Sequence, residues 1–227
     1  MKRIAITGYK GNIGKILTKA LKNKYSLVLL DLPNDNILNY QKTKQKLSSC
    51  DTIIHLAWNC FTENVSNHKK DPKNLQMSFN IYKLAKELKI KRVIMASSVH
   101  VHDIETIRKN NKKITNTTKT NPISPYGKDK VFLENEGRKY AKFFEVICIR
   151  YGGVAPKKSP WGDCYFVGLT HPDLVSLIKK CINTRTLPKK FITLFGVSKN
   201  KYRIHDLENP LNWKPKDDAI EFYNINL

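Results

Sequence analysis

Hydrophobic and polar residues alternate along this chain in two kinds of segment, and the alternation predicts its fold class. Five short apolar runs, each of strand length, lie at residues 2–7, 26–31, 51–56, 91–96 and 145–150. Apolar residues at helical spacing predict helices over residues 12–24, 40–48, 72–89, 124–143 and 171–183. Strands with continuous apolar centres are typical of parallel sheets covered on both faces. The pattern therefore predicts an α/β fold built on a doubly wound parallel sheet.

The alternation loosens after residue 150, where glycine, proline and aromatic residues become dense. We expect residues 1–150 to form the sheet core and residues 151–227 to form a small substrate-binding lobe packed on it, within one structural domain. The polar stretch 103–121 predicts a surface loop just before the helix at 124–143.

The charge of the chain is strongly positive, with 41 Lys and Arg against 19 Asp and Glu and a formal net charge of +22. Such a charge is typical of proteins that bind nucleic acids or membrane surfaces. However, 34 of the basic residues are Lys and only 7 are Arg, the residue suited to bidentate phosphate recognition. The lysines are spread over helices and loops, so we expect no dedicated nucleic-acid binding.

The sequence lacks the features that are typical of membrane, secreted, disulfide-bonded and metal-binding proteins. No window holds eighteen consecutive apolar residues, and the N-terminus begins with a strand rather than a signal-peptide apolar region. The five cysteines are odd in number and form no CxxC pair, which favours reduced thiols in a cytoplasmic protein. His100 and His102 lack partners for a metal site, and His55 is expected to pack at a strand end.

The first strand runs into a glycine motif with the spacing of a dinucleotide site. Gly8, Gly11 and Gly14 precede and open the helix at 12–24, and the second strand ends on Asp31. Such glycines let the backbone approach a pyrophosphate, whose charge faces the helix N-terminus. The Asp31 carboxylate accepts hydrogen bonds from ribose hydroxyls and repels a 2′-phosphate, so this Rossmann-type site is predicted to prefer NAD over NADP.

A second group of residues suits proton transfer. Tyr126 and Lys130 are four apart and share one face of the predicted helix. An ammonium near a phenol stabilises the phenolate and lowers the pKa of the Tyr, which then exchanges a proton with a hydroxyl or carbonyl. Ser98, at the carboxyl end of the fourth strand, is expected to hold the same substrate oxygen.

Together these motifs resemble the extended short-chain dehydrogenase/reductases, the NAD-dependent epimerase/dehydratase family. The resemblance covers nearly the whole chain and includes the glycine spacing, His55-Leu56-Ala57 and the pair Tyr126 and Lys130. Within this family the segment Ser97-Ser98-Val99-His100 is similar to that of uronate dehydrogenases. The C-terminal runs from Phe195 to Ser198 and from Leu211 to Asp217 are also similar to theirs.

The resemblance implies a role for each site residue. The catalytic residues are Ser98, Tyr126 and Lys130. The cofactor-binding residues are Gly8, Gly11, Asn12, Ile13, Gly14, Asp31, Leu32, Asn36, Leu56, Ala57, Trp58, Asn74, Tyr126, Lys130 and Gly153. The substrate-binding residues are Cys60, Ser98, Val99 and His100, with Lys157 and Lys158 as candidates.

Three departures from the family pattern affect the substrate. Cys60 stands where the family has a serine, and Val99 stands where it has an asparagine. The arginine that grips a substrate carboxylate has no counterpart; Lys157 or Lys158 offers only a point charge instead. We therefore lean towards a substrate other than a plain hexuronate.

These observations predict an NAD-dependent oxidoreductase that acts on a sugar or sugar-acid hydroxyl, in a homo-oligomer such as a dimer. A nucleotide-sugar epimerase, dehydratase or 4-keto reductase is the enzymatic alternative, although the 77 residues after Arg150 leave little room for a nucleotide diphosphate. A non-catalytic NAD-binding regulator is the alternative from another class.

Overall fold

The computed structural model describes residues 1–59, 71–155 and 164–225 and contains a six-stranded sheet in which neighbouring strands are parallel. Its strands are β1 (Arg3–Thr7), β2 (Ser26–Leu30), β3 (Thr52–His55), β4 (Arg92–Ser98), β5 (Glu145–Tyr151) and β6 (Phe191–Gly196). Their spatial order is β2-β1-β3-β4-β5-β6. The predicted doubly wound parallel sheet is confirmed.

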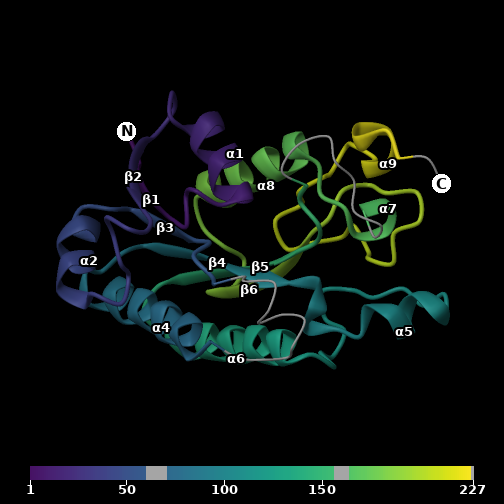
Figure 1. Cartoon of the computed structure of the whole chain (residues 1–227), viewed down its shortest axis with the longest axis horizontal. Coiled ribbons are helices and arrows are strands. Elements are labelled where there is room, and N and C mark those ends of the chain that lie inside the picture. Colours follow the sequence, from purple (N-terminus) through teal and green to yellow (C-terminus); the bar gives the residue numbers. More distant parts are fainter. Residues whose placement is uncertain (60–70, 156–163, 226–227) are drawn as a thin grey trace.

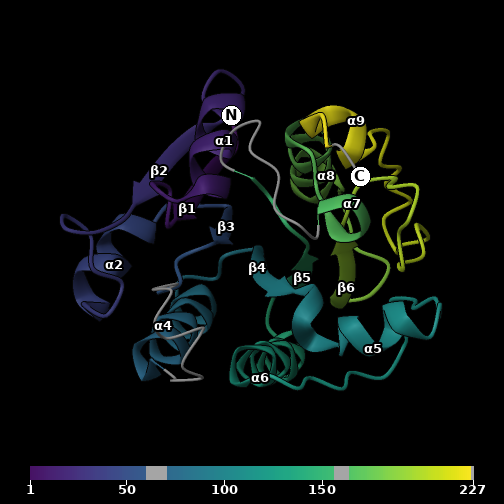
Figure 2. The same ribbon diagram turned by 45° about the vertical axis from the view of Figure 1, so that its right-hand side comes forward.

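Helices cover both faces of this sheet. The described helices are α1 (Asn12–Leu21), α2 (Tyr40–Leu47), α4 (Pro72–Glu87), α5 (Ile104–Lys109), α6 (Pro125–Tyr140), α7 (Cys164–Val167), α8 (His171–Asn183) and α9 (Ala219–Tyr223), with the 3-10 turn η1 (Val99–Val101). Figures 1 and 2 show α1 and α8 on one face and α4 and α6 on the other. Each face has its own apolar core, because alternate strand residues point to opposite sides.

The strand order places the ligand crevice. The chain leaves β2 on one side of β1 and re-enters the sheet as β3 on the other side. Ligands of doubly wound sheets bind at such a switch point, beyond the carboxyl ends of the strands. Thr7 pairs with His55 at this end, and Ser98 pairs with Tyr151 two strands away.

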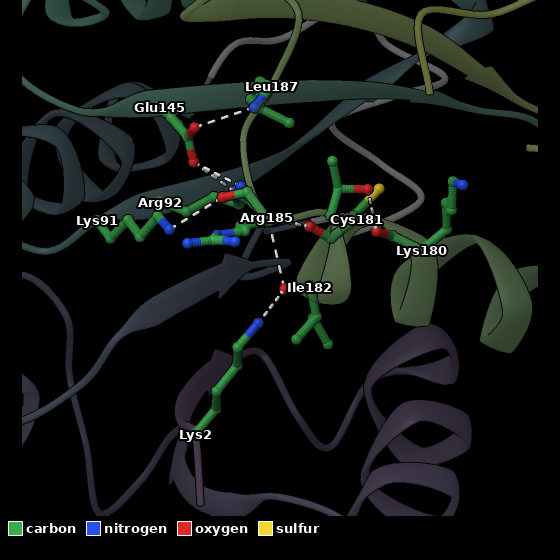
Figure 3. Close-up of polar contacts among 10 residues, drawn as sticks. Lys2, Lys91, Arg92, Glu145, Lys180, Cys181, Ile182, Arg185 and Leu187 are labelled. Atoms are coloured by element: carbon green, nitrogen blue, oxygen red, sulfur yellow. Dashed lines mark hydrogen bonds and ion pairs between the residues drawn. The ribbon is translucent and has the colours of Figure 1, made fainter. Parts of the chain in front are cut away.

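The amino end of the sheet is fixed by a buried ion pair. Arg92 donates to the Glu145 carboxylate from Nε at 2.9 Å and from Nη2 at 2.5 Å, and it also donates to the carbonyl of Cys181 in α8. Lys2 and Lys91 donate to carbonyls at and beyond the end of α8 (Figure 3). These bonds lock the register of β4 and β5 and tie α8 to the sheet, at the end opposite Ser98.

The structure differs from the sequence-based expectations in two places. β6, within residues 151–227, extends the main sheet and was not predicted; the domain division at residue 150 stays a prediction. The expectation of a loop throughout 103–121 was wrong, because α5 occupies its start. Asp103 caps this helix by accepting from the Thr106 N–H, and Ile104 and Ile107 are buried in an apolar cluster.

Among the described residues, no helix is long and apolar enough to cross a membrane.

Candidate active site

The turn between β1 and α1 holds three glycines that meet different demands. Gly8 has φ +71°, and a Cβ on it would lie 2.7 Å from the Ala57 nitrogen; a Cβ on Gly14 would lie 2.4 Å from the Gly8 oxygen. The packing of the chain therefore requires both to be glycine. A Cβ on Gly11 would meet only the Gly8 oxygen, at 3.4 Å, among the described atoms. Gly11 thus leaves space that the described part of the chain does not fill, which fits a bound pyrophosphate.

Gly11 is also the N-cap of α1, and within the described chain no side chain caps this helix. Asn12 and Ile13 form its first turn. Asn12 is exposed and Ile13 is half-buried. The N–H groups of a first turn without a side-chain cap suit an anionic ligand.

Asp31 lies just after β2, beside this turn. One carboxylate oxygen accepts from the Lys10 N–H and the other from the Leu32 N–H, each at 2.8 Å. These bonds fix the orientation of the carboxylate, which has about four acceptor positions in all and keeps capacity for ribose hydroxyls. The residues that sequence reasoning missed here include Lys10, whose ammonium donates to the Leu32 carbonyl at 2.6 Å. Its position two residues after Gly8 was the available signal.

Two further residues predicted to bind the cofactor, Leu32 and Asn36, lie on the surface beyond β2. Leu32 is 59% exposed. Asn36 is exposed, and its side-chain oxygen accepts from the Leu38 N–H at 3.0 Å, so it is engaged in a local turn. Their contact with a cofactor stays a prediction.

The segment after β3 lines the switch point. Leu56, Ala57 and Trp58 are half-buried, and the Leu56 N–H donates to the Thr7 carbonyl at 3.1 Å. His55 is buried between Thr7 Oγ1, at 2.7 Å, and Ser78 Oγ, at 3.1 Å. Burial and the charge of Lys130 lower the pKa of His55 to about 3. His55 is therefore a neutral packing residue that links β1, β3 and α4.

Asn74 is 4% exposed, and its side chain binds the backbone of Asn59. Its Oδ1 accepts from the Asn59 N–H at 2.6 Å, and its Nδ2 donates to the Asn59 carbonyl at 3.3 Å. In the structure Asn74 thus anchors the end of the segment that carries Trp58, and a direct cofactor contact stays a prediction.

Tyr126 and Lys130 lie in α6, which the local sequence begins sharply. Ser124 caps the helix by accepting from the Gly127 N–H at 3.0 Å, and Pro125 starts it. A Cβ on Gly127 would lie 2.2 Å from the His100 carbonyl oxygen, so only glycine lets the first turn approach η1 this closely. As a result the Tyr126 and His100 rings lie 6.3 Å apart.

Lys130 points into the protein beneath this turn. Its side chain is buried, and its Nζ donates to the Ala96 carbonyl of β4 at 2.9 Å. The ammonium lies 5.5 Å from the centroid of the Tyr126 ring. Tyr126 itself is half-buried. The structure therefore brings together the two residues that the sequence pairs for proton transfer.

Ser98 lies at the carboxyl end of β4 and is 4% exposed. Its Oγ accepts from the His100 N–H at 3.2 Å, which caps η1. His100 is exposed. Val99 is 2% exposed and packs in the apolar cluster with Ile104, and its contact with a substrate stays a prediction.

Glu134 is a second residue that sequence reasoning missed. Its buried carboxylate accepts from Ser97 Oγ at 2.6 Å and from Arg150 Nε at 2.9 Å and Nη2 at 2.8 Å. It therefore ties α6 to β4 and β5 next to Ser98. Its spacing, four residues after Lys130 on the same helix face, was the available signal.

The remaining predicted residues divide into described and undescribed ones. The Gly153 N–H donates to the Val167 carbonyl at 3.0 Å, which holds the chain leaving β5 against the end of α7. Cys60, Lys157 and Lys158 lie outside the described residues. No cluster of three or more His, Cys, Asp or Glu suited to a metal occurs in the part of the chain that the structure describes.

The match to a known protein family covers the residues of this site. The model of the NAD dependent epimerase/dehydratase family matches residues 4–158, the span that contains the glycine turn, Asp31, Ser98, Tyr126 and Lys130. The chain belongs to this family. It is an NAD-dependent enzyme of the dehydrogenase and epimerase type, and NAD is its cofactor.

Two relatives of this chain are named as dehydrogenases of a sugar or a sugar acid. The chain is 26% identical to a uronate dehydrogenase of Agrobacterium fabrum, over 98% of this chain and 87% of that protein. It is 27% identical to an L-arabinose 1-dehydrogenase (NAD(P)(+)) of Haloferax volcanii, over 67% of each chain.

Two solved structures are similar to this chain over nearly its whole length. A uronate dehydrogenase from Agrobacterium tumefaciens, solved as a mutant complexed with NAD, is 25% identical with a TM-score of 0.80, over 99% of this chain and 88% of that one. A UDP-N-acetylglucosamine 4-epimerase from Bacillus cereus, 14% identical with a TM-score of 0.75 over 98% of this chain and 94% of that one, shares the fold.

Proposed function

We propose that this protein oxidises a hydroxyl group of a sugar or sugar acid with NAD. The observation that supports the proposal is that Lys130 donates to the Ala96 carbonyl of β4, the strand that ends on Ser98, while the Tyr126 ring lies 6.3 Å from that of His100. Their elements, β4 and α6, are in contact, and β4 is separated from the glycine turn only by β3. The names of the sequence relatives support a sugar or sugar-acid substrate.

In the proposed reaction Tyr126 accepts the proton of the substrate hydroxyl. Lys130, as the ammonium, stabilises the phenolate form of Tyr126 that accepts this proton and becomes the phenol, and the Ser98 hydroxyl orients the substrate oxygen that loses it. NAD, when bound, supplies the hydride acceptor. Gly8, Gly11 and Gly14 are proposed to admit its pyrophosphate and Asp31 to bind its adenosine ribose, while Leu56, Ala57 and Trp58 are proposed to line the NAD channel.

The substrate class is proposed only as far as a sugar or sugar acid. Relatives named for a uronate and for arabinose differ in whether the substrate carries a carboxylate. Lys157 and Lys158, the candidates for binding a carboxylate, lie outside the described residues, and the absence of the family arginine still favours a substrate other than a plain hexuronate.

The test is a screen of NADH formation with galacturonate, glucuronate, arabinose and other aldoses, beside UDP-sugars analysed for epimerisation. NADH formed from a uronate or an aldose supports the proposal. Isomerisation of a UDP-sugar without net NADH would instead identify an epimerase. NAD binding without turnover of any of these compounds would favour a regulatory protein.

If a uronate is turned over efficiently, Lys157→Ala and Lys158→Ala identify which lysine binds its carboxylate. Loss of uronate turnover in either variant, with NADH affinity unchanged, would show that lysine has replaced the arginine. It would also show that our preference for a substrate other than a hexuronate is wrong.

We also propose a cytoplasmic homodimer. Cys50, Cys148 and Cys181 are free and buried, which suits a reducing compartment. Phe132 of α6 is 43% exposed and packs edge-on against Phe79 of α4, which gives these two helices an apolar patch for a second copy. Light scattering coupled to gel filtration tests this assembly. We expect a dimer that Phe132→Ser dissociates into monomers, and a monomeric wild-type protein would contradict the proposal.

A further inference from the structure

The ammonium group of Lys130 is buried against an indole ring. Its side chain is 3% exposed, and Nζ lies 3.5 Å from the centroid of the Trp58 ring. A cation at this distance from the face of a tryptophan is attracted by the negative π face, and the attraction strengthens where water is excluded. The contact joins the segment after β3 to the catalytic helix α6.

Trp58 also contacts Tyr126. The two rings meet edge to face, with centroids 5.8 Å apart and planes at 83°. The Lys130 ammonium lies 5.5 Å from the Tyr126 centroid. One indole ring therefore touches both residues that are proposed to carry the proton chemistry.

The backbone on either side of Trp58 is anchored. Two residues before it, the Leu56 N–H donates to the Thr7 carbonyl of β1 at 3.1 Å. One residue after it, the Asn59 backbone is held by Asn74 through both polar atoms of the amide. The indole face is thus presented to Lys130 by a segment fixed at both ends.

We propose that Trp58 is a positioning residue of this active site, whose indole face holds the Lys130 ammonium beside Tyr126 through a cation–π interaction. Its effect on turnover rests on the proposed function, whereas the contact itself belongs to the folded chain without ligand. The Ala96 carbonyl accepts a hydrogen bond from the same ammonium at 2.9 Å, so this carbonyl and the indole face together fix the position of the ammonium.

The first experiment changes the charge on the ring face without changing its size. Tryptophan bearing one to three fluorine atoms is incorporated in place of the three tryptophans, at positions 58, 161 and 213. We expect turnover and the urea midpoint of the ligand-free protein to fall stepwise with each fluorine, by on the order of 10-fold in turnover across the series. The control is the same series in Trp58→Phe, where only positions 161 and 213 carry the analogue, and it should show no such trend.

The second experiment is a double-mutant cycle in the ligand-free protein, with Trp58→Leu, Lys130→Met and the double variant. Trp58→Leu should reduce the folding equilibrium constant about 10-fold more in the wild-type background than in Lys130→Met. Trp213→Leu is the matched control, because Trp213 is buried and donates from Nε1 to Ser176 Oγ, and its effect should add to that of Lys130→Met.

Two outcomes would overturn the proposal: an additive cycle at Trp58, or a fluorine series as flat as its control. If any variant fails to fold, the fluorine series still decides, since it keeps the side-chain volume. If no sugar is turned over, the proposed function fails separately, and the urea midpoints of the fluorine series and the double-mutant cycle still test the contact between Trp58 and Lys130.

Discussion

At the scale of single residues, Tyr126 carries the most specific expectation. Tyr126→Phe removes the phenol oxygen and keeps the ring that packs against Trp58 and His100. We expect turnover to fall by about 10²- to 10⁴-fold, with NADH affinity changed by less than about threefold, because the hydroxyl acts in proton transfer. Steady-state kinetics and NADH fluorescence titration measure both. Tyr202→Phe, at an exposed position, serves as the control, and full activity of Tyr126→Phe would refute the mechanism.

Cofactor choice is also decided by single residues. Asp31 disfavours a 2′-phosphate, whereas the Lys10 ammonium, which donates to the Leu32 carbonyl next to Asp31, would attract one. We expect NAD to bind more tightly than NADP, Asp31→Ala to lose that preference, and Lys10→Ala to increase it severalfold. Calorimetry with both cofactors measures the ratio. Tighter binding of NADP by the wild type would contradict the assignment.

At the scale of elements, α6 is held by Glu134. Its carboxylate accepts from Ser97 of β4 and from Arg150 of β5, and all three side chains are buried. Removing one partner of a buried ion pair leaves the other charge uncompensated. Glu134→Gln should therefore lower the free energy of unfolding by about 3–5 kcal/mol.

Glu136→Gln is the matched control on the same helix. Glu136 pairs with the exposed Lys139, so its loss should cost at most about 1 kcal/mol. Urea unfolding compares the two variants. Equal effects would show that the buried network does not hold α6 more strongly than a surface pair does.

At the scale of the whole molecule, buried histidines link stability to pH. Burial lowers the pKa of His55 to about 3, of His102 to about 4 and of His205 to about 3. Positive charges lower these pKa values further: the charge of Lys130 acts on His55, and the charge of Arg150 acts on His102 and His205. The unfolded chain binds these protons near pH 6.5, so stability is complete above that pH and is lost as the pH falls towards the folded values.

We expect the free energy of unfolding, measured with urea, to fall between about pH 7 and about pH 5, by up to about 1.4 kcal/mol per pH unit for each histidine. His205→Phe, at a fully buried site against the Phe195 ring, should reduce this slope by removing one titrating group. A free energy of unfolding that stays constant over this range, or an unchanged slope in the variant, would contradict the assignment.

The sequence alone determined the features that are local. Apolar strand runs, helical spacing, the glycine turn and the spacing of Tyr126 and Lys130 are set by neighbouring residues, so the parallel sheet and its strand-end site were predictable. The start of α5 was also a local feature, through the cap at Asp103, but its polar composition concealed it. β6 follows the predicted helix 171–183, but its apolar run lies in the region interpreted as a substrate-binding lobe and was not interpreted as a strand.

Only the tertiary structure decided which side chains meet across elements. Three contacts of this kind join residues from different strands, helices and loops. Lys130 lies over the Trp58 ring, Glu134 bonds to Ser97 and Arg150, and Asn74 bonds to the backbone of Asn59. The packing of Val99 in an apolar cluster with Ile104 is likewise a tertiary feature. The physical reason is that burial and partner distance depend on how the elements pack, and periodicity along one element carries no information about the face it meets.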